Sequence, residues 1–311
     1  MGKKLVFDIE KVFKSYQENQ VLKNISLKWE EGILGLIGPN GTGKSTLIKI
    51  ISTLLRPDSG YIKILGKDVL KEPLEVRKRI GVLFENPVFH PNLKVLSSLC
   101  WLGEIRNLSK KIAKHQAHEL LEYFELNPAS DYRLRELSAG MRQKYGLICA
   151  TIGNPPLIIL DEPTSNLDPD SRRLYTSYVS RLAQEHKCNF LISSHVLEEL
   201  NRLCNGFVFL FGGVLTEFGK REDLLSKLSS QQHIIITKNP HKLYPLLIDE
   251  RLQIKSVNDT KITVKEESFQ KLMDILLRLQ KQGFVEEFKI KTDSEIETLY
   301  QKLSSQFRKR I

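Results

Sequence analysis

Residues 38–46 read G-P-N-G-T-G-K-S-T, and the rest of the chain is best interpreted from this stretch outward. It follows a short apolar run at 33–37 and precedes another at 47–51, which has the composition of a helix start. The order strand, glycine-rich turn and helix puts the pattern G-x-x-x-x-G-K-[ST] on the turn. Backbone N–H groups in such a turn face an anion, and the helix N-terminus adds positive charge. The stretch therefore predicts a phosphate-binding loop.

The residue types in this loop suit that chemistry. Glycines at three positions allow the backbone to curl. Lys44 is expected to reach the outer phosphates, and the Ser45 hydroxyl is expected to bind Mg²⁺. The predicted binding residues of the loop are Gly38, Pro39, Asn40, Gly41, Thr42, Gly43, Lys44, Ser45 and Thr46.

Composition places the chain among ordinary globular proteins. Its 311 residues, 41% apolar and 27% charged, are enough for about two domains. No run approaches the roughly 18 apolar residues of a membrane span, and the first residues lack a secretory apolar core. The four cysteines form no C-x-x-C pair, which predicts reduced thiols without a metal or disulfide role. The net charge of +10 allows a nucleotide, a membrane surface or nucleic acid as partner.

Short apolar runs alternate with helical patterns through the first two thirds of the chain. The runs at 157–160 and 190–193 have the continuous apolar character of central strands, and a helix at 170–185 separates them. This alternation predicts a parallel sheet with right-handed crossovers, in an α/β fold. The other predicted elements are strands at 5–13, 25–29, 61–65 and 80–84, a helical region from 92 to 150 and a hairpin of 207–211 with 214–218. Tyr16 falls in a polar link at 15–24.

The pattern changes near residue 229, and a second domain is predicted there. Strands and helices follow in the order βαββαβ, with one further helix at the end. That order favours a small α+β domain of the ferredoxin-like type. The predicted limits are 1–228 for the first domain, with a helical subdomain at about 88–150, and 231–311 for the second.

Carboxylates and a histidine follow two of the predicted central strands. Asp161 and Glu162 end the run at 157–160, where Asp161 is expected to hold Mg²⁺ and Glu162 to orient or deprotonate an attacking water. His195 follows the run at 190–193 and suits either a γ-phosphate contact or a structural hydrogen bond. Ser138 and Gly140, in L-S-A-G-M, precede a helix, where a serine is also an ordinary N-cap.

Taken together and in this order, these motifs make residues 5–228 resemble the ATP-binding subunit of an ATP-binding-cassette (ABC) transporter. The resemblance is closest to single-cassette subunits that pair with separate membrane proteins in drug, sodium or polysaccharide exporters. The matching motifs are Walker A at 38–45, the signature loop at 137–141, Walker B at 160–162, the D-loop at 165–168 and the switch histidine His195.

The resemblance implies a P-loop NTPase cassette, with a mixed sheet core and a helical subdomain, that hydrolyses ATP with Mg²⁺. It implies that Tyr16 stacks on adenine, and that Ser138 and Gly140 contact the ATP held by a second cassette. Closing and opening of that dimer would drive an integral membrane permease, which places the chain in the cytoplasm against the inner face of the cell membrane. No nucleic-acid partner is expected.

The chain departs from the family pattern at two positions. Glu85 stands where the family has the Q-loop glutamine, so an oxygen ligand for Mg²⁺ is kept while a negative charge is added and an amide donor is lost. Ala139 replaces the usual second glycine of the signature, which is harmless if its φ is negative.

The sequence leaves two other functions open. One is a non-transport ABC ATPase that acts on ribosomes or nucleic acid, although such proteins usually carry two cassettes or a long coiled coil. The other is a regulatory module that closes on ATP and barely hydrolyses it, against which Glu162 and His195 argue. A GTPase is disfavoured because no N-K-x-D motif is present.

Overall fold

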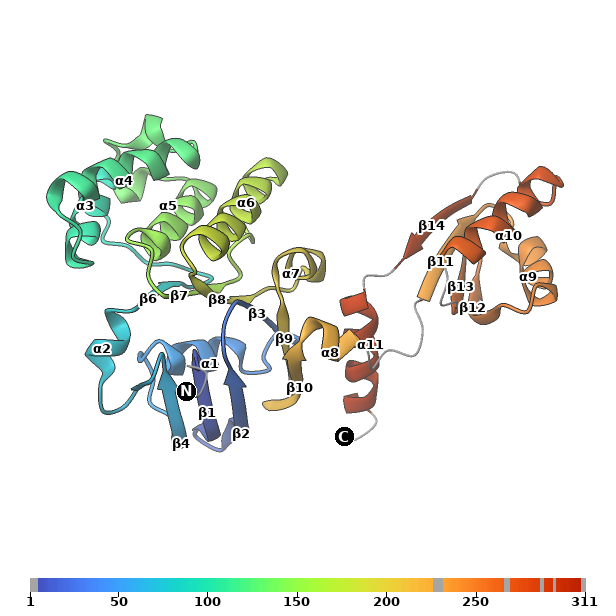
Figure 1. Cartoon of the computed structure of the whole chain (residues 1–311), viewed down its shortest axis with the longest axis horizontal. Coiled ribbons are helices and arrows are strands. Elements are labelled where there is room, and N and C mark those ends of the chain that lie inside the picture. Colours follow the sequence, from blue (N-terminus) through green and yellow to red (C-terminus); the bar gives the residue numbers. More distant parts are fainter. Residues whose placement is uncertain (1–4, 226–231, 266–268, 286–287, 293–294, 309–311) are drawn as a thin grey trace. The chain divides into compact units, whose positions relative to one another are not determined.

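The computed structural model describes residues 5–225, 232–265, 269–285, 288–292 and 295–308. The chain divides into two compact units, Met1–Arg221 and Glu222–Ile311, each with its own elements (Figure 1). The sequence-based boundary between residues 228 and 231 lies outside the described residues, so those domain limits stay a prediction.

A six-stranded sheet forms the centre of the first unit. Its order is β10-β9-β3-β8-β7-β6, with β10 antiparallel to β9 and all other neighbours parallel. Every residue of β3, β7 and β9 is buried, which explains the continuous apolar runs in the sequence. The strands are β3 (Ile33–Ile37), β6 (Ile80–Leu83), β7 (Leu157–Asp161), β8 (Asn189–Ser193), β9 (Gly206–Phe211) and β10 (Val214–Lys220).

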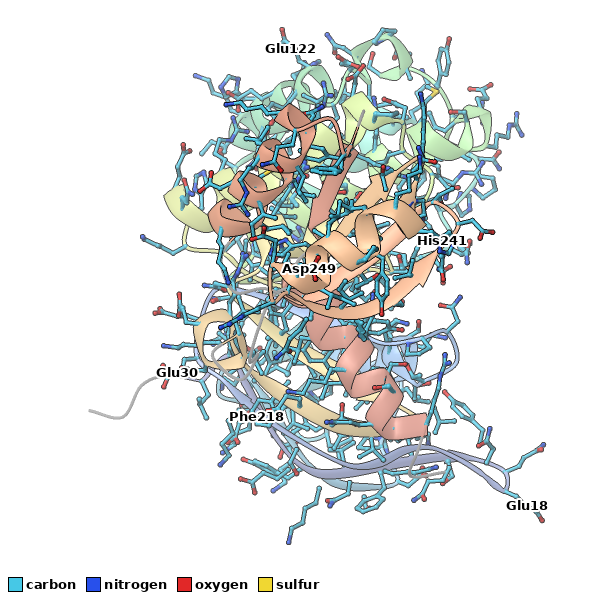
Figure 2. All side chains as sticks on the ribbon, turned by 90° about the vertical axis from the view of Figure 1, so that its right-hand side faces the viewer. Glu18, Glu30, Glu122, Phe218, His241 and Asp249 are labelled. Carbon is cyan, nitrogen blue, oxygen red and sulfur yellow. The ribbon has the colours of Figure 1, made fainter. Side chains whose placement is uncertain are left out.

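A second sheet, antiparallel and four-stranded, has the order β2-β1-β4-β5. Its strands are β1 (Phe7–Tyr16), β2 (Asn19–Trp29), β4 (Ser59–Ile64) and β5 (Lys67–Asp68). The link predicted at 15–24 is wrong, because β1 and β2 pair as far as Tyr16 and Asn19. Only Gln17 and Glu18 form the turn, and the Glu18 side chain points away from the protein (Figure 2). The outer part of this hairpin is largely exposed, so its residues lack the apolar alternation that marks a strand.

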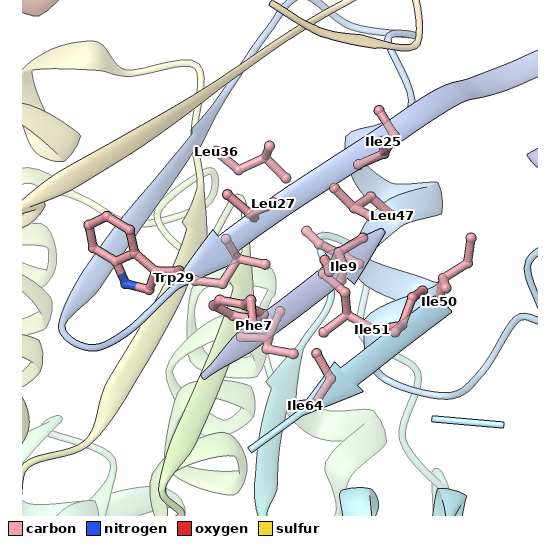
Figure 3. Packing of buried hydrophobic residues seen from close by; sticks show 14 of the residues in the cluster. Phe7, Ile9, Ile25, Leu27, Trp29, Leu36, Leu47, Ile50, Ile51 and Ile64 are labelled. Carbon is pink, nitrogen blue, oxygen red and sulfur yellow. The ribbon is translucent and has the colours of Figure 1, made fainter. Parts of the chain in front are cut away.

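The main core of the first unit lies between its two sheets. Figure 3 shows Phe7 and Ile9 of β1 with Ile25 and Leu27 of β2, packed near Leu47 of α1 (Lys44–Ile51). Leu34, Ile159 and Leu210 extend the same cluster into the central sheet. The helix that follows the phosphate-binding loop is therefore anchored from both sheets by apolar burial.

Helices complete the first unit. α5 packs on β6 and β7, and α3 packs on α4 and α5 (Figure 1). The remaining helices are α2 (Pro73–Arg77), α3 (Val95–Ile105), α4 (Lys110–Tyr123), α5 (Ala139–Thr151), α6 (Pro169–Glu185) and α7 (Leu197–Leu203), with 3₁₀ turns at Asn127–Ala129 and Leu134–Glu136. α8 (Arg221–Leu225) begins at the last residue of the first unit and continues into the second. Within the described part of the chain, none of the helices has the length and apolar character needed to cross a membrane.

The second unit contains an antiparallel sheet of order β12-β13-β11-β14 with its own apolar core. Residues of α9 and α10, including Leu243 and Leu276, pack with Ile235 and Ile262 of the sheet. The element order is the one expected from the sequence, while its assignment to the ferredoxin-like type stays a prediction. The elements are β11 (Gln232–Thr237), α9 (Pro240–Asp249), β12 (Gln253–Asn258), β13 (Lys261–Lys265), α10 (Phe269–Lys281), β14 (Phe288–Thr292) and α11 (Glu295–Arg308).

Candidate nucleotide site

A cavity of about 420 Å³ lies in the first unit at the carboxyl ends of β3, β7 and β8. It is lined by the phosphate-binding loop, by the end of Walker B and by His195, two residues after β8. In a parallel sheet, this edge is where loops from several strands converge and ligands bind. The lining residues are Val21, Asn40, Gly41, Gly43, Lys44, Ser45, Thr46, Glu85, Asp161, Glu162 and His195.

The phosphate-binding loop wraps around the ammonium group of Lys44. Its Nζ donates hydrogen bonds to the carbonyl oxygens of Gly38 at 2.7 Å and Pro39 at 3.0 Å. Thr42 Oγ1 donates to the same Pro39 oxygen at 2.9 Å, which ties the loop together. Burial lowers the pKa of Lys44, and the carboxylates of Glu162, Asp161 and Glu85 act in the opposite direction. A buried cation facing three carboxylates is an electrostatic setting that favours binding of a phosphate together with a metal ion.

Two of the loop glycines are needed for different reasons. Gly41 has φ of +78° with nothing within 4 Å of an added Cβ, so its requirement is conformational. At Gly38 the φ is not positive, and an added Cβ would lie 2.2 Å from the carbonyl oxygen of Leu210 in β9. Gly38 is therefore required for the close approach of the loop to the neighbouring strand.

Asp161 and Glu162 are both buried, with exposures of 2% and 8%. Ser193 Oγ, at the end of β8, donates a hydrogen bond to Asp161 Oδ1. The Glu162 N–H donates to the carbonyl oxygen of Ser193 at 3.1 Å and to its Oγ at 3.2 Å. The Asp161 carboxylate and the Glu162 backbone are thus held by the neighbouring strand, and Glu162 lines the cavity beside Lys44.

His195 is hydrogen-bonded directly to Glu162. Its Nδ1 lies 2.7 Å from Glu162 Oε2, and its backbone N–H donates to the same oxygen at 3.3 Å. The imidazole remains about two thirds exposed, at 65%, while the Glu162 side chain is 10% exposed. The histidine therefore links the buried carboxylate to the open side of the cavity, which suits contact with a terminal phosphate.

Six predicted site residues do not line the cavity: Gly38, Pro39 and Thr42 of the loop, and three residues outside the loop, Ser138, Gly140 and Tyr16. Ser138 is the N-cap of α5, where its Oγ accepts a hydrogen bond from Met141 N at 3.2 Å. Gly140 lies in the same first turn, and an added Cβ would lie 3.2 Å from the carbonyl oxygen of Asn166. Tyr16 ends β1 and is 46% exposed, with Lys14 Nζ at 5.9 Å from its ring centroid. Ala139 begins α5 and is not among the described residues with positive φ, so it replaces glycine without strain.

The site also depends on residues that the sequence did not single out. Val21 of β2 lines the cavity, and Ser193 holds Asp161 and Glu162. Gln143 of α5 is 2% exposed and donates to the carbonyl oxygens of Glu162 and Pro163. A signal for Gln143 was present, because it shares the buried face of α5 with Leu147 and Ala150, four and seven residues later.

The side chains that line the cavity can supply only some of the oxygen ligands that a hard divalent cation needs. Glu85, Asp161 and Ser45 line one cavity and offer the oxygen atoms that Mg²⁺ prefers. Within the described residues, however, no group of three or more His, Cys, Asp or Glu side chains is close enough to hold a metal ion. The fit is therefore that of a metal held by one or two protein oxygens together with phosphate and water, as is usual for Mg²⁺ in phosphoryl transfer.

Comparisons with known proteins agree on one family. A family model described as ABC transporter matches residues 22–165. The ABC transporter ATP-binding protein NatA of Bacillus subtilis (strain 168) is 32% identical over 214 residues, or 68% of this chain and 87% of that protein. The linearmycin resistance ATP-binding protein LnrL of the same organism is 33% identical over 229 residues, covering 73% of each chain.

Solved structures agree with this result. The structure of an ATP-binding subunit of an ABC transporter has a TM-score of 0.67 and 28% identity, and the alignment covers 71% of this chain and 92% of that one. A dimeric bacterial ABC transporter cassette, at 24% identity and a TM-score of 0.64, covers 69% of this chain and 98% of its own, and supports the fold. The chain belongs to the family of ATP-binding proteins of ABC transporters, ATPases that drive transport.

Proposed function

We propose that this chain binds ATP with Mg²⁺ in the cavity described above and hydrolyses it to drive a separate membrane permease. The observation that carries the proposal is the convergence of Lys44, Ser45, Asp161, Glu162 and His195 on one cavity. These residues come from three separate strand ends, and each has a side chain suited to one part of phosphoryl transfer.

The loop and the metal ligands would bind the triphosphate. Lys44 and the N-terminus of α1 would supply positive charge for the outer phosphates, and backbone N–H groups of the loop would donate hydrogen bonds to them. Ser45, Asp161 and Glu85 would hold Mg²⁺, either directly or through water. The metal would neutralise charge on the phosphate oxygens. Tyr16 as the adenine platform remains part of the proposal, although it does not line the cavity.

Glu162 and His195 would carry out the hydrolysis. In the proposed step a water oxygen attacks the γ-phosphorus while Glu162 takes up one of its protons, and the bond to the β-phosphate oxygen breaks. The hydrogen bond between Glu162 Oε2 and His195 Nδ1 fixes the carboxylate. The imidazole, which is 65% exposed, would contact the γ-phosphate. Positioned proton transfer of this kind typically contributes 10²- to 10⁴-fold to a rate.

The site requires a second cassette to be complete. Ser138 and Gly140 begin a helix whose positive end suits a phosphate, yet they do not line the cavity of their own chain. We therefore propose a dimer in which this helix end faces the γ-phosphate bound by the other copy. Loss of that phosphate after hydrolysis removes the attraction, which allows the pair to open.

The permease is proposed to dock on the segment after Glu85. Val88 is 93% exposed in this segment, and Leu93 and Trp101 add further exposed apolar surface along and just beyond it. Large exposed apolar side chains along one segment favour a protein interaction site there. Through this partner the chain would lie at the inner face of the cell membrane. No observation favours the ribosome- or nucleic-acid-associated alternative.

The test is the variant Glu162→Gln, which keeps the size of the side chain and removes the proton acceptor. We expect kcat for ATP hydrolysis to fall by about 100-fold or more, while the Kd for ATP stays close to that of the wild type. Steady-state phosphate release and isothermal titration measure the two quantities. With ATP and Mg²⁺ present, size-exclusion chromatography should show a stable dimer.

Glu198→Gln is the matched control, since Glu198 is an exposed carboxylate on α7 that pairs with Arg202. This control should hydrolyse ATP at the wild-type rate. An unchanged kcat in Glu162→Gln would refute the assignment of the hydrolytic base, and a wild-type protein without ATPase activity would refute the function itself.

A further inference from the structure

The backbone of Glu162 adopts a conformation that non-glycine residues rarely occupy. Its φ is +49°, in the left-handed region, where an L-residue is strained by its Cβ. Such conformations persist only when surrounding contacts determine them. The direction in which the Glu162 carboxylate points therefore depends on the groups that hold its backbone from both sides.

Contacts on the N–H side of Glu162 come from β8. As described above, its N–H donates to Ser193, and its carboxylate meets His195 just beyond the same strand. These contacts position Glu162 relative to its own sheet, in which β7 and β8 are direct neighbours (Figure 1).

Contacts on the carbonyl side come from a different element, the signature helix α5. Gln143 Nε2 donates to the carbonyl oxygen of Pro163 at 2.9 Å and to that of Glu162 at 3.4 Å. The Glu162 oxygen also accepts from the Ser165 N–H at 3.3 Å, which closes the turn. Because Gln143 is 2% exposed, water cannot readily replace these bonds, and separating α5 from the turn would leave buried polar groups unpaired.

Gln143 and the signature residues lie on one rigid element. Ser138 caps α5 and Gln143 follows five positions later, which is about 7.5 Å along a helix at 1.5 Å per residue. Any displacement of the helix start is therefore transmitted to the amide of Gln143 and from it to the peptide between Glu162 and Pro163.

We propose that Gln143 is a positioning residue for hydrolysis, which sets the Glu162 carboxylate by clamping the 162–163 turn to the signature helix. This inference rests on the proposed function and extends it. In the dimer, the start of α5 would contact the nucleotide of the opposite site while Gln143 holds the hydrolytic carboxylate of its own site. The geometry of one site would then affect the readiness of the other.

The first experiment uses Gln143→Met in the full-length chain, because methionine has similar length and no hydrogen-bond donor. We expect kcat for ATP hydrolysis to fall by about 10- to 100-fold, since a catalytic group displaced by an ångström can lose that much. The KM for ATP should stay within about twofold, because Gln143 does not line the cavity. Gln143→Asn shortens the side chain by one methylene, so it should also lower kcat. It is the test variant if Gln143→Met does not fold.

Thr151→Val is the matched control. Thr151 is fully buried on the same helix, and its Oγ1 donates to the Leu147 carbonyl oxygen within α5. The substitution removes a buried hydroxyl from α5 without touching the 162–163 turn, so kcat should remain at the wild-type value. An equal loss of kcat in this control would mean that α5 merely needs its buried polar groups for stability.

The second experiment combines Gln143→Met with Glu162→Gln. If Gln143 acts through the carboxylate, it should lower the rate about 10-fold or more in the wild-type background and hardly at all in the Glu162→Gln background. The ATP-dependent dimer of the double variant should form at the same ATP concentration as that of Glu162→Gln. A further loss of rate, or a weakened dimer, would overturn the positioning role. Wild-type kcat in Gln143→Met would overturn it as well while leaving the proposed function standing.

Discussion

Single residues in the phosphate-binding loop are constrained either by conformation or by space. Gly41 needs its positive φ but has open space around it, while Gly38 has ordinary φ and lies against the Leu210 carbonyl of β9. The pattern G-x-x-x-x-G-K-[ST] requires glycine at position 38 and leaves position 41 open, and only the surroundings show why each of the two is glycine. Ala139 is a similar case, because its backbone is helical and the position therefore does not require glycine.

The different requirements at Gly38 and Gly41 predict which of two alanine substitutions is more damaging. Gly38→Ala should strongly weaken binding of ATP and lower the thermal midpoint, because its Cβ would meet a backbone oxygen at 2.2 Å that no side-chain movement can clear. Gly41→Ala should cost about 1 kcal/mol of stability from its left-handed backbone. Thermal unfolding and isothermal titration of both variants test this, and a more damaging Gly41→Ala would contradict it.

At the scale of elements, helix caps decide where the functional helices begin. Asp168 caps α6 and accepts hydrogen bonds from Ser171 N at 2.9 Å and Ser171 Oγ at 2.6 Å. These two donors lower the pKa of Asp168 to about 2. Since Asp168 is the last residue of the D-loop, its side chain fixes where α6 begins directly after that loop.

The lowered pKa of Asp168 predicts a pH-dependent stability. Its unfolded value is about 3.9, so the stabilisation by the charged cap is complete above that pH and is lost as pH falls toward about 2. Asp168→Asn keeps an N-cap but does not titrate. The wild type should therefore have the slightly higher thermal midpoint at neutral pH, and the difference should vanish between about pH 4 and 2. Because Asp168 is exposed, the effect should be small and weaken with salt. A difference that is independent of pH would contradict this account.

The second element-scale feature is the junction of α5 with the turn after β7. The amide of Gln143 bridges two elements that are twenty residues apart in sequence. A buried hydrogen bond of this kind gives the signature helix a fixed position relative to the hydrolytic carboxylate, which apolar packing alone would not specify.

For the whole molecule, the two units have separate apolar cores. The cluster around Phe7 and Ile159 belongs to the first unit, and the cluster around Ile235 and Leu276 belongs to the second. Chains with more than one core commonly unfold in more than one transition.

This organisation predicts how ligand and mutation act on unfolding. ATP with Mg²⁺ should raise the midpoint of the unit that contains the cavity, because ligands stabilise the folded state they bind. Leu276→Ala, at a fully buried position, should destabilise the other unit by about 2–5 kcal/mol and leave the ATP-dependent shift intact. Scanning calorimetry with and without nucleotide measures both, and loss of the ATP-dependent shift in Leu276→Ala would contradict the prediction.

Sequence alone identified the features that depend on local spacing. The phosphate-binding loop, the carboxylate pair after an apolar strand and the alternation of strands and helices are short-range patterns, and each is governed by the conformation of a few adjacent residues. The loop therefore follows β3, and Asp161 and Glu162 lie at the end of β7, as the sequence pattern predicts, while their roles stay a prediction.

Tertiary structure decided the features that depend on contacts between distant elements. Three features follow from pairing and packing across tens of residues. They are the position of Tyr16 at a strand end, the position of Ser138 outside its own cavity, and the groups that hold Glu162. Such contacts leave no fixed spacing in the sequence, because a buried hydrogen bond requires only that two surfaces meet. The polar Gln143 on an apolar helix face was the one visible sign of them.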